Sequence, residues 1–311
     1  MNEPIEINGL VKDFQGFRAV DSLQLTVHKG SFTGFLGPNG AGKTTTIKIL
    51  TNLIRSSSGT ALLNGIDVGD DPKQALSEVG AVVETPEFYP YLTPKETLEY
   101  LGKLRGMTNE SISARTVEVL ETVKMTEWTD KRIGKFSKGM KQRVALAQAI
   151  MHKPSIIILD EPTSGLDPRG MYEIREVLKD LRKQQYTVFM SSHLLNEVQD
   201  VCTDLALINR GKLLRKGSVE ALLKEVTARR IEVRLARPMP QDTFARLAAI
   251  KGVGTIATPS TLELAFDYQG DDEQQADLLI ALTGMGMKVA SFKEAGLALE
   301  TLYMSLISDS R

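Results

Sequence analysis

The chain has 311 residues, of which 42% are apolar, and its formal net charge is −1. A chain of this length can hold one large domain and a small one, each with a buried core. The near-neutral charge gives no bulk attraction to nucleic acid or to anionic lipid. The single cysteine, Cys202, excludes an intramolecular disulfide and fits a reducing cytosol; we expect it to be a small buried side chain.

The N-terminal residues have neither a basic start nor an apolar core, so they do not resemble a signal peptide. No run of apolar residues approaches the ~18 that a membrane-spanning helix needs. The longest candidate, residues 155–159, is expected to be a short buried strand. We therefore expect a chain that is soluble by itself.

The first 83 residues carry short apolar runs separated by turns. Alternating apolar residues predict a strand at 5–10, and a segment at 19–27 leads toward a second, mostly apolar strand at 32–36. That strand runs into a glycine-rich turn, and a helix follows whose buried face begins at Ile47. Asn64-Gly65 predicts a tight turn between two further short strands.

The composition changes after residue 83, where apolar residues take up helical spacing. Residues 94–125 show this spacing at Leu98, Leu101, Leu104, Val117, Leu120 and Val123. It predicts a helical subdomain at about 90–150, inserted into an α/β frame. Strands and helices then alternate, which argues for a largely parallel sheet and a first domain ending at residue 226. The predicted elements are strands at 156–159 and 187–190, helices at 171–184 and 194–201, a hairpin over 204–216 and a helix at 218–224.

Residues 227–311 predict a second, smaller domain of α+β class. The predicted strands are 230–235, 253–257, 261–267 and 287–292, with helices at about 241–250 and at 272–283. This order, βαββαβ, is the ferredoxin-like arrangement. We expect the first of these helices to bury Phe244, Leu247 and Ile250. A final helix is expected to bury Leu297, Leu299, Leu302 and Leu306.

The stretch from Gly37 to Thr44 fits the phosphate-binding pattern G-x-x-x-x-G-K-[ST], between the strand and the helix that this pattern requires. Its backbone amides and the helix N-terminus would face a polyphosphate. Lys43 would reach the β- and γ-phosphates, and the Thr44 hydroxyl would bind Mg²⁺. The alternative is a glycine-rich surface turn followed by an exposed lysine. The expected nucleotide-binding residues here are Gly37, Pro38, Asn39, Gly40, Ala41, Gly42, Lys43, Thr44 and Thr45.

Two further stretches carry candidate chemistry. The apolar strand at 156–159 ends in Asp160 and Glu161, so one carboxylate can hold Mg²⁺ and the next can orient or deprotonate an attacking water. Ser137 and Gly139 stand at the start of a predicted helix, where a free hydroxyl and the helix dipole can bind a phosphate. From the residues alone, Ser137 is equally well explained as the cap of its own helix.

Five stretches in this order resemble the ATP-binding subunit of ABC transporters, and the resemblance covers about residues 1–225. They are Gly37–Thr44, Phe136–Met140, Asp160-Glu161, Ser164–Asp167 and Ser191-Ser192-His193.

The resemblance implies a role for each stretch. Gly37–Thr44 corresponds to the Walker A loop, and Asp160 ends the Walker B strand. Glu161 corresponds to the catalytic carboxylate, and His193 to the switch histidine that contacts the γ-phosphate. Residues 164–167, ending in Asp167, correspond to the D-loop. Ser137, Lys138 and Gly139 correspond to the signature that binds ATP held by the other subunit. Outside this resemblance, His193 would be an ordinary polar loop residue.

Three positions depart from the usual family pattern. The signature contains Phe-Ser-Lys-Gly-Met in place of Leu-Ser-Gly-Gly-Gln, but it keeps the hydroxyl and the second glycine. Phe14 stands where many members have the tyrosine that stacks on adenine. Glu84 replaces a glutamine that reaches Mg²⁺, and with the Phe-Tyr-Pro that follows it resembles the ATPases of bacitracin- and lantibiotic-type exporters. Glu84 could otherwise be a solvated loop charge.

The resemblance implies an α/β ATPase core with a small antiparallel sheet, which binds ATP and Mg²⁺. It implies a homodimer or a paralogous heterodimer, and export through a separately encoded integral-membrane permease. The expected location is cytoplasmic, on the inner face of the cell membrane, with no nucleic-acid partner. An alternative is a soluble ABC-type ATPase acting on nucleic acid or ribosomes. The C-terminal domain could also be a small-molecule sensor, although no ligand-binding pattern is evident in it.

Overall fold

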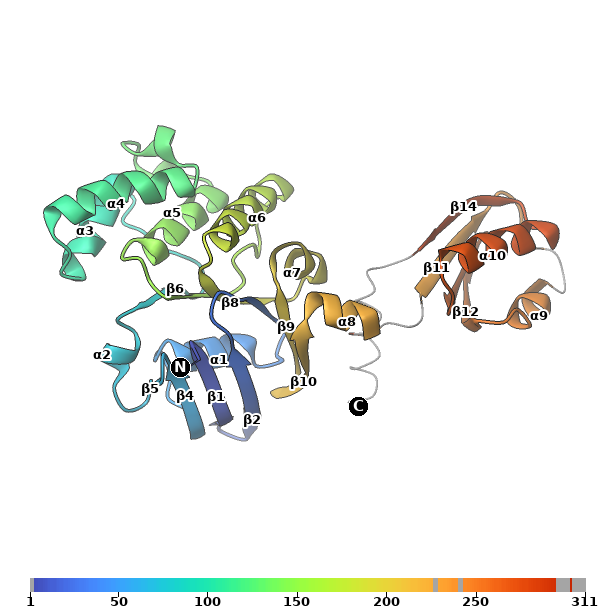
Figure 1. The fold of residues 1–311 in the computed structure, drawn as a ribbon. Coiled ribbons are helices and arrows are strands. Elements are labelled where there is room, and N and C mark those ends of the chain that lie inside the picture. Colours follow the sequence, from blue (N-terminus) through green and yellow to red (C-terminus); the bar gives the residue numbers. More distant parts are fainter. Residues whose placement is uncertain (1–2, 226–228, 240–242, 295–302, 304–311) are drawn as a thin grey trace. The chain divides into compact units, whose positions relative to one another are not determined.

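The computed structural model of the chain describes residues 3–225, 229–239, 243–294 and 303. The chain divides into two compact units, Met1–Val219 and Glu220–Arg311, and each is described by itself (Figure 1). The domain boundary expected from the sequence, after residue 226, falls outside the described residues.

A six-stranded sheet forms the centre of the first unit, in the order β10-β9-β3-β8-β7-β6. The five strands from β9 to β6 are parallel, and β10 pairs with β9 as the expected antiparallel hairpin. Helices cover such parallel strands on both faces, which explains why β7 and β8 are buried along their whole length. The strands are β3 (Phe32–Leu36), β6 (Val79–Val82), β7 (Ile156–Leu159), β8 (Thr187–Ser192), β9 (Asp204–Asn209) and β10 (Lys212–Ser218).

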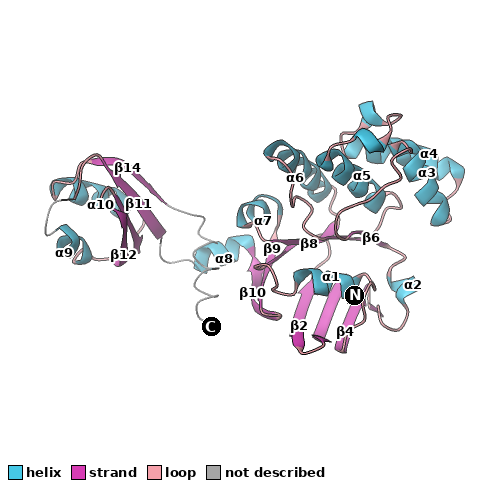
Figure 2. Ribbon diagram, turned by 180° about the vertical axis from the view of Figure 1, so that it is seen from behind, coloured by secondary structure: helices cyan, strands magenta, loops and turns pink. Residues whose placement is uncertain are grey.

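A four-stranded antiparallel sheet, in the order β2-β1-β4-β5, is the second layer of this unit (Figure 2). Helix α1 (Lys43–Leu50) lies between the two sheets. Its Ile47 and Leu50 belong to the same buried core as Ile7 of the antiparallel sheet and Ile158 of the parallel one. The antiparallel strands are β1 (Ile5–Phe14), β2 (Phe17–Val27), β4 (Ser58–Leu63) and β5 (Ile66–Asp67).

The helical subdomain expected at about 90–150 is present on the other side of the six-stranded sheet (Figures 1 and 2). A capping box at Thr93 and Glu96 begins its first helix. Leu98, Leu120 and Val123 are buried, but Leu104 and Val117 are 67% and 66% exposed although they share the helical spacing. The helices and 3₁₀ turns of this segment are α3 (Pro94–Leu104), α4 (Asn109–Thr122), η1 (Thr126–Trp128), η2 (Ile133–Lys135) and α5 (Lys138–Ile150).

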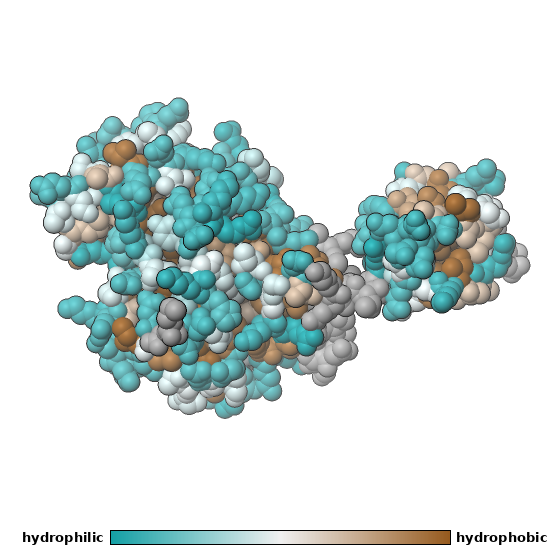
Figure 3. All heavy atoms as spheres, viewed as in Figure 1, coloured by the Kyte–Doolittle hydropathy of each residue, from teal (hydrophilic) through white to brown (hydrophobic). Residues whose placement is uncertain are grey.

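Three of the remaining helices of the chain's first 225 residues follow the predicted order, and one short helix was not predicted. The three are α6 (Pro168–Lys183), α7 (Leu195–Val201) and α8 (Val219–Glu225), and the unpredicted helix is α2 (Pro72–Ala75). Cys202 follows α7 and is 4% exposed; burial raises the pKa of its thiol, which keeps it protonated and unreactive. No helix in the described part of the chain is long and apolar enough to cross a membrane. The face shown in Figure 3 is mostly hydrophilic, with small scattered apolar patches.

The second unit has the predicted βαββαβ order, and its sheet is antiparallel throughout, in the order β12-β13-β11-β14. Leu247 is fully buried in its core and Ile250 partly, but the expectation for Phe244 is wrong: this side chain is 48% exposed. Helix α9 covers only six residues, so its narrow buried face excludes Phe244. The four leucines of the expected final helix lie outside the described ranges. The elements are β11 (Arg229–Leu235), α9 (Thr243–Ala248), β12 (Val253–Ser260), β13 (Glu263–Tyr268), α10 (Asp272–Gly284) and β14 (Val289–Glu294).

Candidate active site

The glycine-rich loop connects β3 to α1 at the carboxyl edge of the parallel strands. Two of its glycines have no room for a side chain: a Cβ on Gly37 would lie 2.4 Å from the carbonyl oxygen of Ile208, and one on Gly42 would lie 2.4 Å from that of Ala19. Gly42 also has a φ of +103°, which L-residues rarely adopt. These close backbone approaches fix the loop where it turns into the helix. Asn39 and Gly40 are exposed at its tip.

Lys43 lies inside the curve of this loop and is 5% exposed. Its ammonium group donates to the carbonyl oxygens of Gly37 at 2.8 Å and Pro38 at 3.1 Å. It also lies 3.5 Å from Oε1 of Glu161. The alternative interpretation, an exposed lysine after a surface turn, is therefore wrong. Thr45, two residues further on, is half-buried in α1.

The two candidate acids stand at the end of β7, next to the loop. Asp160 is 7% exposed, and its Oδ1 accepts from the Thr44 hydroxyl at 3.3 Å and from the Ser191 hydroxyl at 2.5 Å. The backbone N–H of Glu161 donates to the same Ser191 hydroxyl at 2.9 Å. Ser191 thus hydrogen-bonds both to the carboxylate of Asp160 and to the backbone of Glu161. The sequence pattern gave it no role, although its place at the end of the neighbouring strand β8 was a usable signal.

Glu161 adopts a φ of +43°, a conformation that costs free energy in a residue with a side chain and that often marks active sites. Its Oε2 lies 3.1 Å from Nδ1 of His193. The structure thus collects Lys43, Thr44, Asp160, Glu161 and His193 at one edge of the sheet. A buried ammonium, two carboxylates, a hydroxyl and an imidazole can together bind a polyphosphate and activate a water.

The other predicted site residues do not join this cluster. The predicted residues outside the glycine-rich loop form no hydrogen bond or ion pair with members of this cluster in the described part of the chain; they are Phe14, Glu84, Ser137, Gly139 and Asp167. Phe14 is 46% exposed at the β1–β2 turn, with Lys12 Nζ 5.0 Å from its ring centroid. The carboxylate of Glu84 pairs with Lys48 at 2.5 Å.

The predicted signature and D-loop residues lie at two helix N-termini. Ser137 caps α5 by accepting from the N–H of Met140 at 3.2 Å, and Asp167 caps α6 in the same way. Gly139 packs against Gly170, because a Cβ on it would meet the Gly170 Cα at 3.4 Å. Lys138 donates to the carbonyl oxygen of Ser164 at 3.1 Å, so the signature segment contacts the D-loop segment of its own chain.

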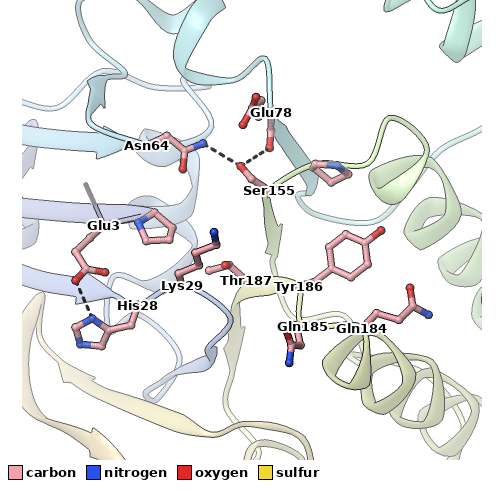
Figure 4. A pocket seen from close by; sticks show the side chains of 12 residues that line it. Glu3, His28, Lys29, Asn64, Glu78, Ser155, Gln184, Gln185, Tyr186 and Thr187 are labelled. Carbon is pink, nitrogen blue, oxygen red and sulfur yellow. Dashed lines mark hydrogen bonds and ion pairs between the residues drawn. The ribbon is translucent and has the colours of Figure 1, made fainter. Parts of the chain in front are cut away.

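A cavity of about 790 Å³ lies at the opposite, amino edge of the same sheet (Figure 4). Its lining residues precede strands, among them His28, Glu78, Ser155 and Tyr186. Ligands of open parallel sheets bind beyond the carboxyl ends of the strands. This cavity is therefore distinct from the phosphate-binding edge.

A strand, a glycine-rich loop and a helix, with an acid on a nearby parallel strand, define the P-loop class of nucleotide-binding proteins. Residues 20–164 match the family described as ABC transporter. The bacitracin transport ATP-binding protein BcrA of Bacillus licheniformis is 40% identical over 225 residues, 72% of each chain. The linearmycin resistance ATP-binding protein LnrL of Bacillus subtilis (strain 168) is 33% identical over 291 residues, 92% of this chain and 93% of that protein.

Solved structures have the same fold as the first unit. The ATP-binding subunit of an ABC transporter superimposes with a TM-score of 0.64 at 26% identity, covering 71% of this chain and 92% of its own. A bacterial ABC transporter cassette solved as a dimer gives a TM-score of 0.62 at 25% identity, covering 69% of this chain and 98% of its own. The chain belongs to the family of ABC transporter ATP-binding proteins, and it is an ATPase.

Proposed function

We propose that this ATPase powers export of an antibiotic, a peptide or another small molecule through a separate membrane permease. The observation that carries the ATPase chemistry is the cluster of Lys43, Asp160, Glu161 and His193 at one sheet edge. Export is supported by the relatives, one named for bacitracin transport and another for linearmycin resistance. The location that follows is cytoplasmic, on the inner face of the cell membrane and attached through the permease.

The geometry supports a role for each residue of the cluster. The loop amides and Lys43 bind the β- and γ-phosphates, and Glu161 takes the proton of the attacking water. His193, in contact with Glu161, orients that carboxylate and contacts the γ-phosphate. Thr44 Oγ1 and Asp160 Oδ1, 3.3 Å apart, are the hard oxygen donors that Mg²⁺ prefers. Mg²⁺ held there would offset the negative charge of the phosphates.

A second subunit, identical or paralogous, completes each site in this proposal. Ser137 and Asp167 are exposed at helix N-termini, and Gly139 is buried in the first turn of α5. Exposed helix N-termini suit contact with ATP held by the partner. Phe14 would stack on the adenine. The dimeric cassette of the same fold supports this arrangement.

An aromatic surface on the helical segment suits the permease. Tyr89, Tyr91 and Tyr100 are 55%, 62% and 47% exposed. Tyr89 lies 5.7 Å from Tyr91 and 6.4 Å from Tyr100, measured between ring centroids. Clustered exposed tyrosines are enriched at protein interfaces. They follow Glu84 in the chain, so the permease would bind beside a candidate metal ligand.

The central experiment is Glu161→Gln, which keeps the size of the side chain and removes the base. We expect ATP binding to persist, hydrolysis to stop, and ATP to hold the subunits together as a dimer in size exclusion. The matched control is Glu176→Gln on α6, whose carboxylate pairs with Lys179. A Glu161→Gln protein that hydrolyses ATP at the parent rate, or stays monomeric with ATP, would contradict the proposal. Co-purification from detergent-solubilised membranes tests for the permease.

A further inference from the structure

A buried glutamate lies behind the catalytic cluster, on helix α7. Glu197 is 5% exposed. Its Oε2 accepts from the Thr163 hydroxyl at 2.5 Å and from the Ser192 hydroxyl at 3.3 Å. Its Oε1 is buried and has no hydrogen-bond partner among the described residues. The sequence pattern did not single out this residue.

The energetics of Glu197 argue against a role in stability. A buried carboxylate is costly unless cations and donors compensate it, and one of its oxygens receives no donor within the described ranges. No ion pair offsets its charge in that part of the chain either. An apolar side chain of similar volume would pack at lower cost. A costly buried polar group of this kind calls for a functional explanation.

The two donors to Glu197 belong to the two segments that carry the catalytic pair. Thr163 follows Glu161 by two residues, and Ser192 directly precedes His193. The Ser192 hydroxyl also accepts from the N–H of Leu194 at 2.9 Å, and its own proton lies between two acceptors, Glu197 Oε2 at 3.3 Å and the carbonyl oxygen of Leu194 at 3.4 Å. Successive residues of a strand point to opposite faces. Ser191 accordingly binds the acids on one side, and Ser192 binds Glu197 on the other.

We propose that Glu197 is a positioning residue that fixes the separation of Glu161 and His193 through Thr163 and Ser192. Glu161 and His193 meet directly at 3.1 Å on one side, and Glu197 joins their segments on the other. Glu161 needs such support because its backbone is strained, with a φ of +43°. This inference rests on the proposed roles of Glu161 and His193 in hydrolysis.

The test compares Glu197→Gln with Thr163→Val, which removes the 2.5 Å hydrogen bond from its other end. Both should lower kcat about tenfold or more while the KM for ATP changes less than about twofold, since neither residue is one of the candidate phosphate-binding residues. Combined in one chain, they should lower kcat no further than either alone, because both act on the same contact: the valine removes it and the glutamine weakens it to a neutral hydrogen bond. The matched control is Asp200→Asn on the same helix, whose carboxylate pairs with Arg175 at 3.1 Å.

The second measurement follows the imidazole of His193 by NMR. The chain has 3 histidines, so the signal of His193 is assigned by its absence in His193→Gln. Glu197→Gln should move this signal and leave that of His28 in place, with an unchanged or raised melting temperature.

Three results separate the possibilities. Parent kcat with an unmoved His193 signal overturns the positioning role. A lower melting temperature with weaker ATP binding shows a purely structural role and also overturns it. If Glu161→Gln hydrolyses ATP at the parent rate, the proposed function fails, whatever Glu197 does.

Discussion

Glu84, the predicted metal ligand, forms an ion pair with Lys48 that would compete with metal binding. Its Oε1 lies 2.5 Å from Nζ of Lys48, and Lys48 is four residues beyond Thr44 on α1. A glutamate that reaches Mg²⁺ at Thr44 and Asp160 must therefore leave this lysine. Lysine and metal would compete for one carboxylate, so in the proposed site both side chains would set the Mg²⁺ dependence of ATP binding.

We predict opposite effects for two variants in this pair. Glu84→Gln should weaken the Mg²⁺ dependence of ATP affinity by roughly three- to tenfold, because a neutral amide is the poorer ligand for Mg²⁺. Lys48→Met should strengthen it by freeing the carboxylate. Mg²⁺ titrations of ATP affinity check both, and the stimulation of ATPase activity by the proposed permease should fall in Glu84→Gln. If the titration curves of the parent, Glu84→Gln and Lys48→Met superimpose, Glu84 does not bind the metal and is only a surface charge.

His152 makes the stability of the fold sensitive to acid. Burial, and after it the charge of Arg105, lowers the pKa of His152 to about 4 from an ordinary 6.5. The unfolded chain therefore binds the proton at higher pH than the folded one, so the stabilising difference is complete above about 6.5 and is lost as the pH falls toward 4. The slope is at most about 1.4 kcal/mol per pH unit, and less because the ring is partly exposed.

The variant His152→Leu should remove this part of the acid sensitivity. Both ring nitrogens of His152 are buried and meet no acceptor or donor at full hydrogen-bond geometry among the described residues, although the Val79 backbone raises the pKa against the effect of burial. Leucine therefore breaks at most one weak contact. Urea unfolding at pH 7, 6 and 5 should show a shallower loss of stability than in the parent. His28→Gln, at an exposed position, is the control. Parallel pH profiles for parent and His152→Leu would show that other groups cause the loss.

At the scale of elements, β3 and α7 approach closely because β3 has a glycine. A Cβ on Gly34 would lie 2.2 Å from Cγ1 of Val198 and 3.1 Å from Sγ of Cys202. Valine is branched at Cβ and cannot swing away. This contact sets the distance between the strand that enters the phosphate-binding loop and the helix that carries Glu197.

We predict that Gly34→Ala destabilises the protein by roughly 1–3 kcal/mol, the usual cost of overpacking. The measurement is the free energy of unfolding in urea. Gly284→Ala, at the end of α10, is the control, since its Cβ would meet nothing within 4 Å. A Gly34→Ala protein as stable as this control would mean that α7 moves freely against β3.

At the scale of the whole molecule, the two units differ in which known proteins resemble them. The alignment with one solved cassette covers 92% of that cassette but only 71% of this chain. Such a cassette can therefore exist without most of the second unit. The second unit has its own buried core, which includes Ile231, Phe266 and Leu282. The linearmycin resistance relative matches 92% of this chain, which includes most of the second unit. Some relatives therefore have this unit as well.

We predict that a chain ending at Val226 folds and binds ATP with unchanged affinity, because every candidate phosphate-binding residue precedes that point. Residues 227–311 alone should also fold. Nucleotide titrations and thermal unfolding of the two fragments, with the full chain as control, check this. A first fragment that fails to fold or to bind nucleotide would show that the units depend on one another.

Local patterns in the sequence determined most of the fold and the phosphate-binding edge. Gly37–Thr44 between a strand and a helix sufficed for the loop, since its glycines, its lysine and its neighbours are contiguous. The alternation of strands and helices sufficed for the parallel sheet, and the βαββαβ order of the second unit followed from short-range periodicity. The burial of single side chains was harder to predict from the sequence. Val117 and Phe244 share the apolar spacing of their helices, yet tertiary packing leaves both exposed.

Only the tertiary structure decided which side chains meet across the sheet. Ser191 binds Asp160, and Glu197 binds Thr163, because β7 and β8 are neighbours although their residues lie more than 30 positions apart. Glu84 and Lys48 are likewise far apart in the sequence, and no periodic pattern predicts their ion pair. A sequence pattern records spacing along one chain, whereas these contacts depend on the order of strands in a sheet. That order is set by how all the buried surfaces pack together.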